Sequence, residues 1–269
     1  MNGFSEFFLN LLLVIVGFVA GIIDSVAGGG GLITVPTLSI AIGPGALAIG
    51  TNKVAAVCSS LFALLVYLRG GHVEIKGHRR FALLTGVGAL LGAMLSPHIP
   101  PPAYRWILLT VCPVILWVVY RKDLWAKAKV QQIVEDPNGA EPSSDGTPPK
   151  ASHARWLLWA AGFACGFYDG IAGPGGGTLM FLSLFLVAKV PLLTAMATAK
   201  IANLSSASVS LASFAVTGHV LWTKGLWVAL GISTGALIGA NFATRNAAPV
   251  ARAMLLVLAS LLLIRLLFT

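Results

Sequence analysis

Two aspartates, each followed by a run of glycines, stand out in an otherwise apolar sequence. The segment 17–31 reads GFVAGIIDSVAGGGG and the segment 162–176 reads GFACGFYDGIAGPGG, so Asp24 and Asp169 occupy the same position of two similar motifs. A carboxylate and a loose backbone are expensive in apolar surroundings, where each polar group needs a partner. Their repetition therefore indicates a functional feature that the chain contains twice.

A pair of lysines also lies inside apolar segments. Lys53 and Lys200 are 147 positions apart and belong to the similar triplets Thr51-Asn52-Lys53 and Thr198-Ala199-Lys200. A lysine at membrane depth costs several kcal/mol unless it is paired or hydrated. The two lysines would offer positive charge to a small anion, and the polar residues expected beside them are Thr51, Asn52, Thr198 and Asn203. Ion pairs with Asp24 and Asp169, or snorkelling to the interface, are the alternative.

The glycine runs are expected to line the same site. A helix broken at such a run frees backbone N–H groups, and these groups bind anions together with the positive end of the following short helix. The residues concerned are Gly28, Gly29, Gly30, Gly31, Gly173, Gly175, Gly176 and Gly177. Close helix packing is the alternative, and it is our interpretation of Gly88, Gly92, Gly235 and Gly239.

Three roles stay open for Asp24 and Asp169, which we expect to couple or gate the site. They could cap the helix break, pair with the lysines, or titrate and so couple substrate movement to protons. Neither glycine run is followed by Lys-Ser or Lys-Thr, so a nucleotide site is only weakly indicated.

Composition predicts an all-α polytopic membrane protein. Hydrophobic residues make up 57 % of the 269 residues, charged residues 10 %, and the mean hydropathy is +0.87. A soluble domain carries about a quarter charged residues, and the alternating pattern of a membrane barrel is absent. The apolar runs predict eight transmembrane helices at 5–27, 45–69, 80–97, 102–121, 154–172, 192–217, 225–244 and 249–268.

The eight helices are expected to form two homologous repeats of four, at 1–121 and 154–269, joined by a polar cytoplasmic linker at 122–153. Two apolar pieces, 32–42 and 178–188, are too short to span the membrane. We therefore expect each to be a re-entrant half-helix directly after its glycine run.

Basic residues set the expected orientation in the cell inner membrane. Arg69, Lys76, Arg79 and Arg80 lie close together, and the linker is also basic at its flanks, so both should face the cytoplasm. Four crossings per half would place both termini on that side and make the repeats parallel. An odd number of crossings per half would make them inverted.

The sequence argues against several other functions. The formal net charge of +9 comes from residues that flank membrane spans, so lipid headgroups, and not nucleic acid, are the expected partners. Histidines fall in predicted loops or at helix ends and cysteines are single, so we expect no metal, no cofactor and no enzymatic site. Whether protons are coupled and whether the protein forms a homodimer stay open.

The duplicated aspartate and glycine motif, the following Leu32 to Leu38 segment and the Thr51-Asn52-Lys53 triplet resemble the sulfite exporter TauE/SafE family, also called the 4-toluene sulfonate uptake permeases. The resemblance covers nearly the whole chain. It implies a secondary transporter for a small sulfur-containing oxyanion such as sulfite or an organosulfonate, and alternating access between two repeats is the mechanism we expect. An anion channel, or a carrier of another organic anion such as a carboxylate, is the alternative. Pro174 and Ala199 break the repeat, so the two half-sites should differ chemically.

Overall fold

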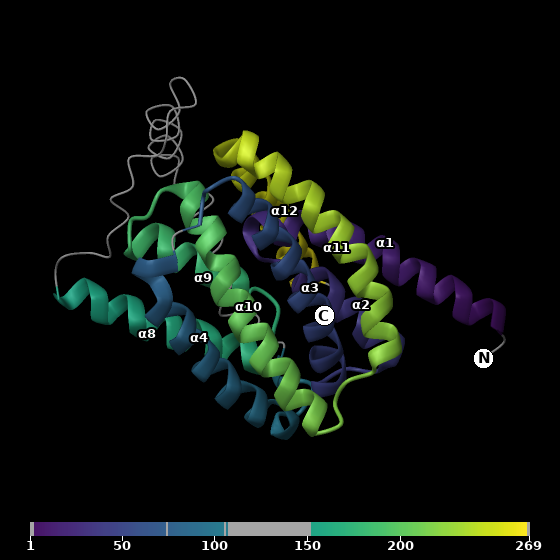
Figure 1. Cartoon of the computed structure of the whole chain (residues 1–269). Coiled ribbons are helices and arrows are strands. Elements are labelled where there is room, and N and C mark those ends of the chain that lie inside the picture. Colours follow the sequence, from purple (N-terminus) through teal and green to yellow (C-terminus); the bar gives the residue numbers. More distant parts are fainter. Residues whose placement is uncertain (1–2, 74, 105, 107–151, 268–269) are drawn as a thin grey trace.

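The computed structural model is all-helical over the residues that it describes, which are 3–73, 75–104, 106 and 152–267 (Figure 1). The first half contains α1 (Gly3–Ala27), α2 (Gly31–Ile42), α3 (Ala46–Arg69), α4 (Ile75–Leu95) and a 3-10 turn, η1 (Ser96–His98). The second half contains α8 (Ser152–Ile171), α9 (Gly176–Leu182), a π-helical turn η2 (Ser183–Val187), α10 (Leu192–Val216), α11 (Trp222–Arg245) and α12 (Ala247–Leu267).

Seven of the eight expected long helices appear within a few residues of their predicted ends. The eighth, at 102–121, lies outside the described residues, as does most of the expected linker. Short helices follow both glycine runs, where the sequence predicts them, as α2 and as α9 with η2. In the described part of the chain, four helices are long and apolar enough to cross a membrane, namely Ser5–Ala27, Ala46–Arg69, His78–His98 and Trp222–Arg245.

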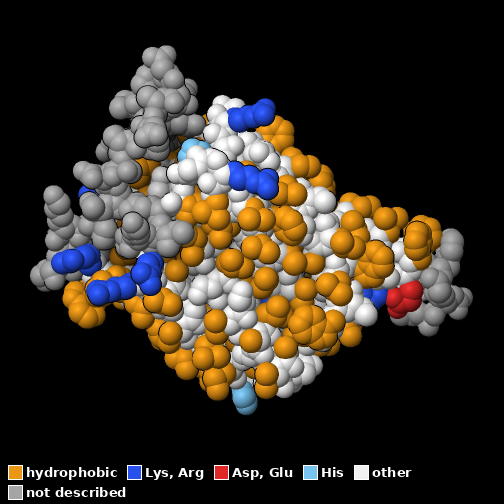
Figure 2. All heavy atoms as spheres, in the orientation of Figure 1, with side chains coloured by type: hydrophobic (Ala, Val, Ile, Leu, Met, Phe, Trp, Pro, Cys, Tyr) orange, Lys and Arg blue, Asp and Glu red, His pale blue; other side chains and the backbone are white. Residues whose placement is uncertain are grey.

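Hydrophobic side chains cover much of the molecular surface, as expected for a protein solvated by lipid. Figure 2 shows a broad apolar area on one face, with most of the visible Lys and Arg side chains at its margins. Large apolar side chains on several of the long helices are exposed, including Leu83 on α4 and Leu230 and Phe242 on α11. Such exposure would be unfavourable in water over so large an area but costs nothing against lipid tails.

The long helices of the two halves interleave, because α1 packs against α11 and α8 packs against α4. Glycines allow the helix backbones to meet at both contacts: a Cβ atom on Gly21 would lie 2.3 Å from the Ile232 carbonyl oxygen, and one on Gly170 would lie 2.3 Å from that of Ala89. Gly88, Gly92, Gly235 and Gly239 make contacts of the same kind. These four glycines therefore serve close packing, as the sequence indicates.

The same contacts give the helix directions. Gly17 and Gly21 face Val228 and Ile232 in that order, so α1 and α11 are parallel. By the same test α8 is parallel to α4, since Gly166 and Gly170 face Thr85 and Ala89. Figure 1 shows α10 and α11 joined by a short turn and running in opposite directions.

The remaining directions follow from two further contacts. Helix α10 is antiparallel to α3, because Gly50 faces Phe214 whereas Ser60 meets Asn203. Helix α10 is parallel to α4, because Gly86 meets Ser205 and the later residue Ala89 meets Ser210. Helices α1, α3 and α11 thus run one way, and α4, α8 and α10 run the other.

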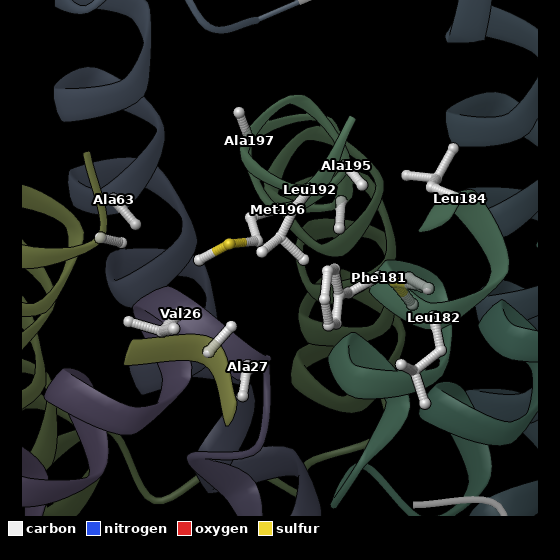
Figure 3. Close-up of a cluster of buried hydrophobic side chains, with 14 of the residues drawn as sticks. Val26, Ala27, Ala63, Phe181, Leu182, Leu184, Leu192, Ala195, Met196 and Ala197 are labelled. Atoms are coloured by element: carbon white, nitrogen blue, oxygen red, sulfur yellow. The ribbon is translucent and has the colours of Figure 1, made fainter. Parts of the chain in front are cut away.

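A buried apolar cluster joins the two halves beside the ends of α1 and α9. Figure 3 shows Val26 and Ala27 from α1 facing Met196 of α10 and Phe181 of α9. All four side chains are at least 99 % buried. The cluster holds the end of α1 against α9 and α10.

We predict that Gly88→Ala destabilises the protein far more than Gly86→Ala, two residues away on the same helix. A Cβ atom on Gly88 would lie 2.2 Å from the Phe163 carbonyl oxygen, and the backbone of α8 cannot move without separating the two helices. A Cβ atom on Gly86 would meet the Ser205 hydroxyl at 2.6 Å, and that side chain can rotate away.

Overpacking of this kind costs about 1–3 kcal/mol. Gly88→Ala should therefore lower the thermal unfolding midpoint of the detergent-solubilised protein by several degrees, while Gly86→Ala leaves it nearly unchanged. Equal midpoints for the two variants would show that α4 and α8 do not meet through this glycine.

Candidate functional site

The two aspartates lie in the last turns of α1 and α8, just before the chain breaks. Gly28 and Gly173 follow with φ angles of 75° and 79°, a left-handed conformation that residues with a side chain rarely adopt. The backbone N–H of Gly28 donates to the Asp24 carbonyl at 2.9 Å, which closes the last turn of α1. Glycine at this position thus lets the chain reverse immediately after each carboxylate.

Each aspartate forms an ion pair with the lysine of the other half. Lys53 Nζ on α3 lies 2.8 Å from Asp169 Oδ2 on α8, and Lys200 Nζ on α10 lies 3.0 Å from Asp24 Oδ2 on α1. The four residues are only 1 to 6 % exposed. The sequence suggested that the lysines and aspartates could pair, but it did not predict that both pairs cross between the halves.

Both lysines also hydrogen-bond to the main chain of their partner aspartate. Lys53 donates to the Asp169 carbonyl oxygen at 2.7 Å, and Lys200 donates to the Asp24 carbonyl oxygen. These carbonyl groups lie in the last turns of their helices, where the helix dipole favours a nearby cation. Each ammonium group is therefore held by two oxygens of one residue.

Two serines complete the coordination of the carboxylates. Ser59 Oγ donates to Asp24 Oδ2 at 2.6 Å, and Ser206 Oγ donates to Asp169 Oδ2. Sequence reasoning missed both serines, although they are 147 positions apart, as Lys53 and Lys200 are. That shared offset is the signal that could have identified them.

The coordination of Asp24 has one donor that Asp169 lacks among the described residues. The Gly30 backbone N–H donates to Asp24 Oδ1 at 3.0 Å, so this carboxylate caps the break as well as pairing with a lysine. For Asp169 the structure gives the lysine and the serine as donors. The two half-sites differ here, and Pro174 next to Gly173 is one of the sequence differences between them.

The glycine runs meet each other at the centre of the molecule. A Cβ atom on Gly28 would lie 2.3 Å from the Gly177 carbonyl carbon, and one on Gly31 would lie 3.2 Å from the Pro174 Cα atom. Gly30 and Gly176 face the carboxylates instead, because a Cβ atom there would lie 2.7 Å from Asp24 Cβ and 2.4 Å from Asp169 Oδ1. In this conformation these glycines make room for backbone crossing and for the aspartate side chains. Gly175, at the start of α9, has a φ of 85°.

The other polar residues predicted for the site are placed around this centre. Asn52 accepts a hydrogen bond from Thr34, and Asn203 Nδ2 donates to Ser60 Oγ at 2.9 Å across the two halves. Thr51 lies further away and accepts from the Leu221 backbone N–H at 2.9 Å. The hydroxyl groups of two other buried threonines, Thr178 and Thr198, have no hydrogen-bond partner among the residues that the structure describes.

The central network is electrically balanced, with two ammonium groups against two carboxylates. Burying an ion pair is costly, and the cost is recovered only when hydrogen bonds satisfy the remaining polar atoms. The serine hydroxyls, the Gly30 amide and the aspartate carbonyls serve that purpose here. In chemical terms, each carboxylate is an anion held by an ammonium group and a hydroxyl, which is the donor set that a small oxyanion needs.

A third buried lysine lies outside this network and was not predicted. Lys224, at the start of α11, forms an ion pair with Glu6 and hydrogen-bonds to Asn10 Oδ1 at 2.9 Å, both on α1. It has no lysine counterpart in the first half, where position 77 is a glycine. The described residues contain no group of three or more His, Cys, Asp or Glu side chains that could hold a metal ion.

The crossed pairing can be tested with double-mutant cycles. Lys53→Ala leaves the Asp169 carboxylate buried and unpaired, which should cost about 3–5 kcal/mol of unfolding free energy. Adding Asp169→Ala should restore part of that loss, because no buried charge is then left alone. Adding Asp24→Ala to Lys53→Ala should instead make the loss larger, since Lys200 also loses its partner.

Unfolding of the purified variants in detergent, followed by circular dichroism, measures these differences. A recovery of stability with Asp24→Ala, and none with Asp169→Ala, would mean that the pairs form within each half.

Comparison with known proteins identifies the family of the chain. Residues 13–266 match the family model described as Sulfite exporter TauE/SafE. The chain is 34 % identical to the probable membrane transporter protein ORF9 of Sinorhizobium sp, over 97 % of this chain and 93 % of that protein.

Two further relatives carry the same description. The chain is 31 % identical to a probable membrane transporter protein of Haemophilus influenzae, over 93 % of this chain and 91 % of that protein. It is 29 % identical to the probable membrane transporter protein YfcA of Escherichia coli K12, over 100 % and 95 %. No solved structure matches the chain significantly. The chain therefore belongs to the sulfite exporter TauE/SafE family and is a multi-pass membrane transporter rather than an enzyme.

Proposed function

We propose that the protein is a secondary transporter that moves a small sulfur-containing oxyanion by alternating access between two repeats. The observation that carries this proposal is the coordination of Asp24 and Asp169. Each carboxylate lies at a helix break between the halves and is held by a lysine ammonium group and a serine hydroxyl. Sulfite and sulfonates present negatively charged oxygens of the same kind to such donors.

The substrate would bind by replacing a carboxylate on its lysine. The positive charge of Lys53 or Lys200 is fully used by its aspartate in this conformation, so an anion gains access only when one pair opens. An ion pair of this type acts as a gate between repeats, which favours a carrier over an open anion channel. The family description supports a sulfur oxyanion as the substrate.

The helix directions support an inverted arrangement of the repeats, with α2 and α9 as re-entrant half-helices. Each long helix of the first half runs opposite to its counterpart, α1 to α8, α3 to α10 and α4 to α11. The short α2 returns toward the end of the molecule from which α1 enters, because its residue Thr34 meets Asn52 near the start of α3. The pair α1 and α2 then contributes no net crossing. Together with α3, α4 and the span that the sequence predicts at 102–121, the first half would have an odd number of crossings.

This arrangement changes the orientation expected from the sequence. The start of α1 lies beside the start of α11, where Lys224 meets Glu6, and α3 begins at that end and finishes with Arg69 at the other. If the basic segment from Arg69 to Arg80 faces the cytoplasm of a bacterial inner membrane, the N-terminus lies on the opposite side. The sequence had suggested that both termini face the cytoplasm.

A small organic carboxylate is the second candidate substrate. The observation in its favour is that the group held by each lysine and serine in this structure is itself a carboxylate. The same site geometry would serve either class of anion, so the distinction rests on measured transport.

Flux through the purified protein in liposomes tests the proposed function. We expect exchange of sulfite, and of other sulfur oxyanions in a panel that includes sulfate, carboxylates and neutral amino acids. Lys53→Gln and Lys200→Gln should each reduce that flux at least about tenfold, since a lost hydrogen bond to a charged group is worth about 1.5–3 kcal/mol.

Lys224→Gln is the matched control, because Lys224 is also buried and paired but lies outside the crossed network. Flux that survives in both central lysine variants, or that is absent for every anion, would contradict the proposal. Exchange of carboxylates alone would select the second candidate.

The inverted arrangement predicts that repeat-equivalent loops lie on opposite sides of the membrane. His72 and His219, 147 positions apart, are partly exposed in the α3 to α4 and α10 to α11 connections. In a background without native cysteines, His72→Cys should react with an impermeant maleimide only from the cytoplasmic side and His219→Cys only from the other side. Labelling of both from the same side would establish parallel repeats.

A further inference from the structure

We infer that Asp169 is a proton carrier, so that one proton travels with each anion, and that Asp24 keeps its charge throughout the cycle. This inference rests on the proposed function and adds the coupling ion, the residue that carries it and the direction of coupling. It follows from the charge balance of the crossed network and from the unequal coordination of its two carboxylates.

Lys53 and Asp169 together are neutral, and both are buried. Adding a singly charged anion, such as hydrogen sulfite or a sulfonate, to Lys53 while Asp169 stays ionised would place one net negative charge in an apolar centre, where uncompensated charge is strongly unfavourable. A proton taken up by the Asp169 carboxylate removes that charge, so anion and proton bind together and are released together. Such coupling is symport.

The lysine remains in position when its carboxylate is protonated. Lys53 donates both to Asp169 Oδ2 at 2.8 Å and to the Asp169 main-chain carbonyl oxygen at 2.7 Å. Protonation weakens the first contact and leaves the second unchanged. The ammonium group is therefore still held at the end of α8 but has a donor position free for the substrate.

The unequal donor sets decide between the two aspartates. Ionised Asp24 accepts from Lys200, from the Ser59 hydroxyl and from the Gly30 amide, whereas Asp169 accepts from Lys53 and from the Ser206 hydroxyl. Each hydrogen bond to a carboxylate favours its charged form. Asp169, with one donor fewer, is the carboxylate that takes up a proton more readily.

Two other titratable side chains lie near the two carboxylates, one on α3 and one on α8. The hydroxyl of Tyr67 on α3 lies near Asp24 and donates to the Ser25 carbonyl at 3.0 Å, and the thiol of Cys165 on α8 lies near Asp169. The charged groups that face the carboxylates are Lys200 on α10 and Lys53 on α3. The aspartates are thus the groups of this network that can exchange a proton during transport.

Sulfite flux in liposomes, measured as a function of pH with the purified full-length protein, tests the inference. The initial rate of the wild-type protein should rise with falling pH, by up to about tenfold per pH unit while Asp169 is mostly ionised, which is the limit for one bound proton. Asp169→Asn imitates the protonated residue, so its sulfite exchange should lose the part of this pH dependence that Asp169 contributes. The protonation of sulfite in solution is the same in both assays. A difference in pH dependence between wild type and variant is therefore due to the protein.

Two serine variants keep the test independent of whether Asp169→Asn folds. Ser206→Ala removes a hydrogen-bond donor from Asp169 and makes that carboxylate easier to protonate. The midpoint of the plot of sulfite flux against pH should therefore rise by about one pH unit. Ser59→Ala makes the equivalent change at Asp24 and should leave the midpoint of the profile in place.

The outcomes separate the two proposals. Absence of sulfite and other anion flux in the wild-type protein would overturn the proposed function. Wild-type flux with a pH profile that is unmoved in Ser206→Ala, or identical in Asp169→Asn, would overturn the proton carrier alone. A profile that moves with Ser59→Ala instead would assign the proton to Asp24.

Discussion

The structure depends on two buried lysine–aspartate pairs, each of which joins one half of the chain to the other. A single unpaired charge at this depth would destabilise the fold by several kcal/mol, and in this structure the partner of each charge lies in the other half. Crossing makes the two halves mutually dependent. It also places four buried charges at their interface, where the substrate would pass in the proposed transport cycle.

Glycine makes this arrangement sterically feasible. The long helices interleave because glycines let α1 approach α11, and α8 approach α4, at backbone distance. At the centre, Gly28 and Gly177 allow the two broken segments to cross, while Gly30 and Gly176 leave space for the carboxylates. The consecutive glycines and the spaced glycines therefore have different roles, the first at the charged centre and the second along the helices that support it.

The sequence predicted the helices well because membrane spans are long, strongly apolar and bounded by polar residues. It also identified the four central charges, since each is isolated in apolar sequence and repeated at a fixed distance. It could not tell whether Lys53 pairs with Asp24 or with Asp169, because sequence positions alone do not show which carboxylate lies closer to Lys53 in space. Packing of the interleaved helices makes that choice. Ser59 and Ser206 were missed because serine is common in membrane helices and carries no charge.

The sequence also left open whether the two repeats are parallel or inverted. The answer depends on the number of membrane crossings in each half, and therefore on whether a long helix and the short helix after its glycine run cross the membrane together or return to the same side. The structure supplies the helix directions, and the charge network joins α3 to α8 and α10 to α1 across the two halves. Two equivalent pairs in opposite orientations would present the same chemistry to either side of the membrane. The small differences between them, such as the Gly30 amide at Asp24, then decide which pair does which task.

The most direct test of the central claim is an experimental structure of the protein with bound sulfite, determined at a pH where transport is fast. We expect the anion to replace the Asp169 carboxylate on Lys53, so that the ligand separates this pair while the pair of Lys200 and Asp24 stays closed. Sulfite bound elsewhere, with both crossed pairs intact, would contradict this expectation.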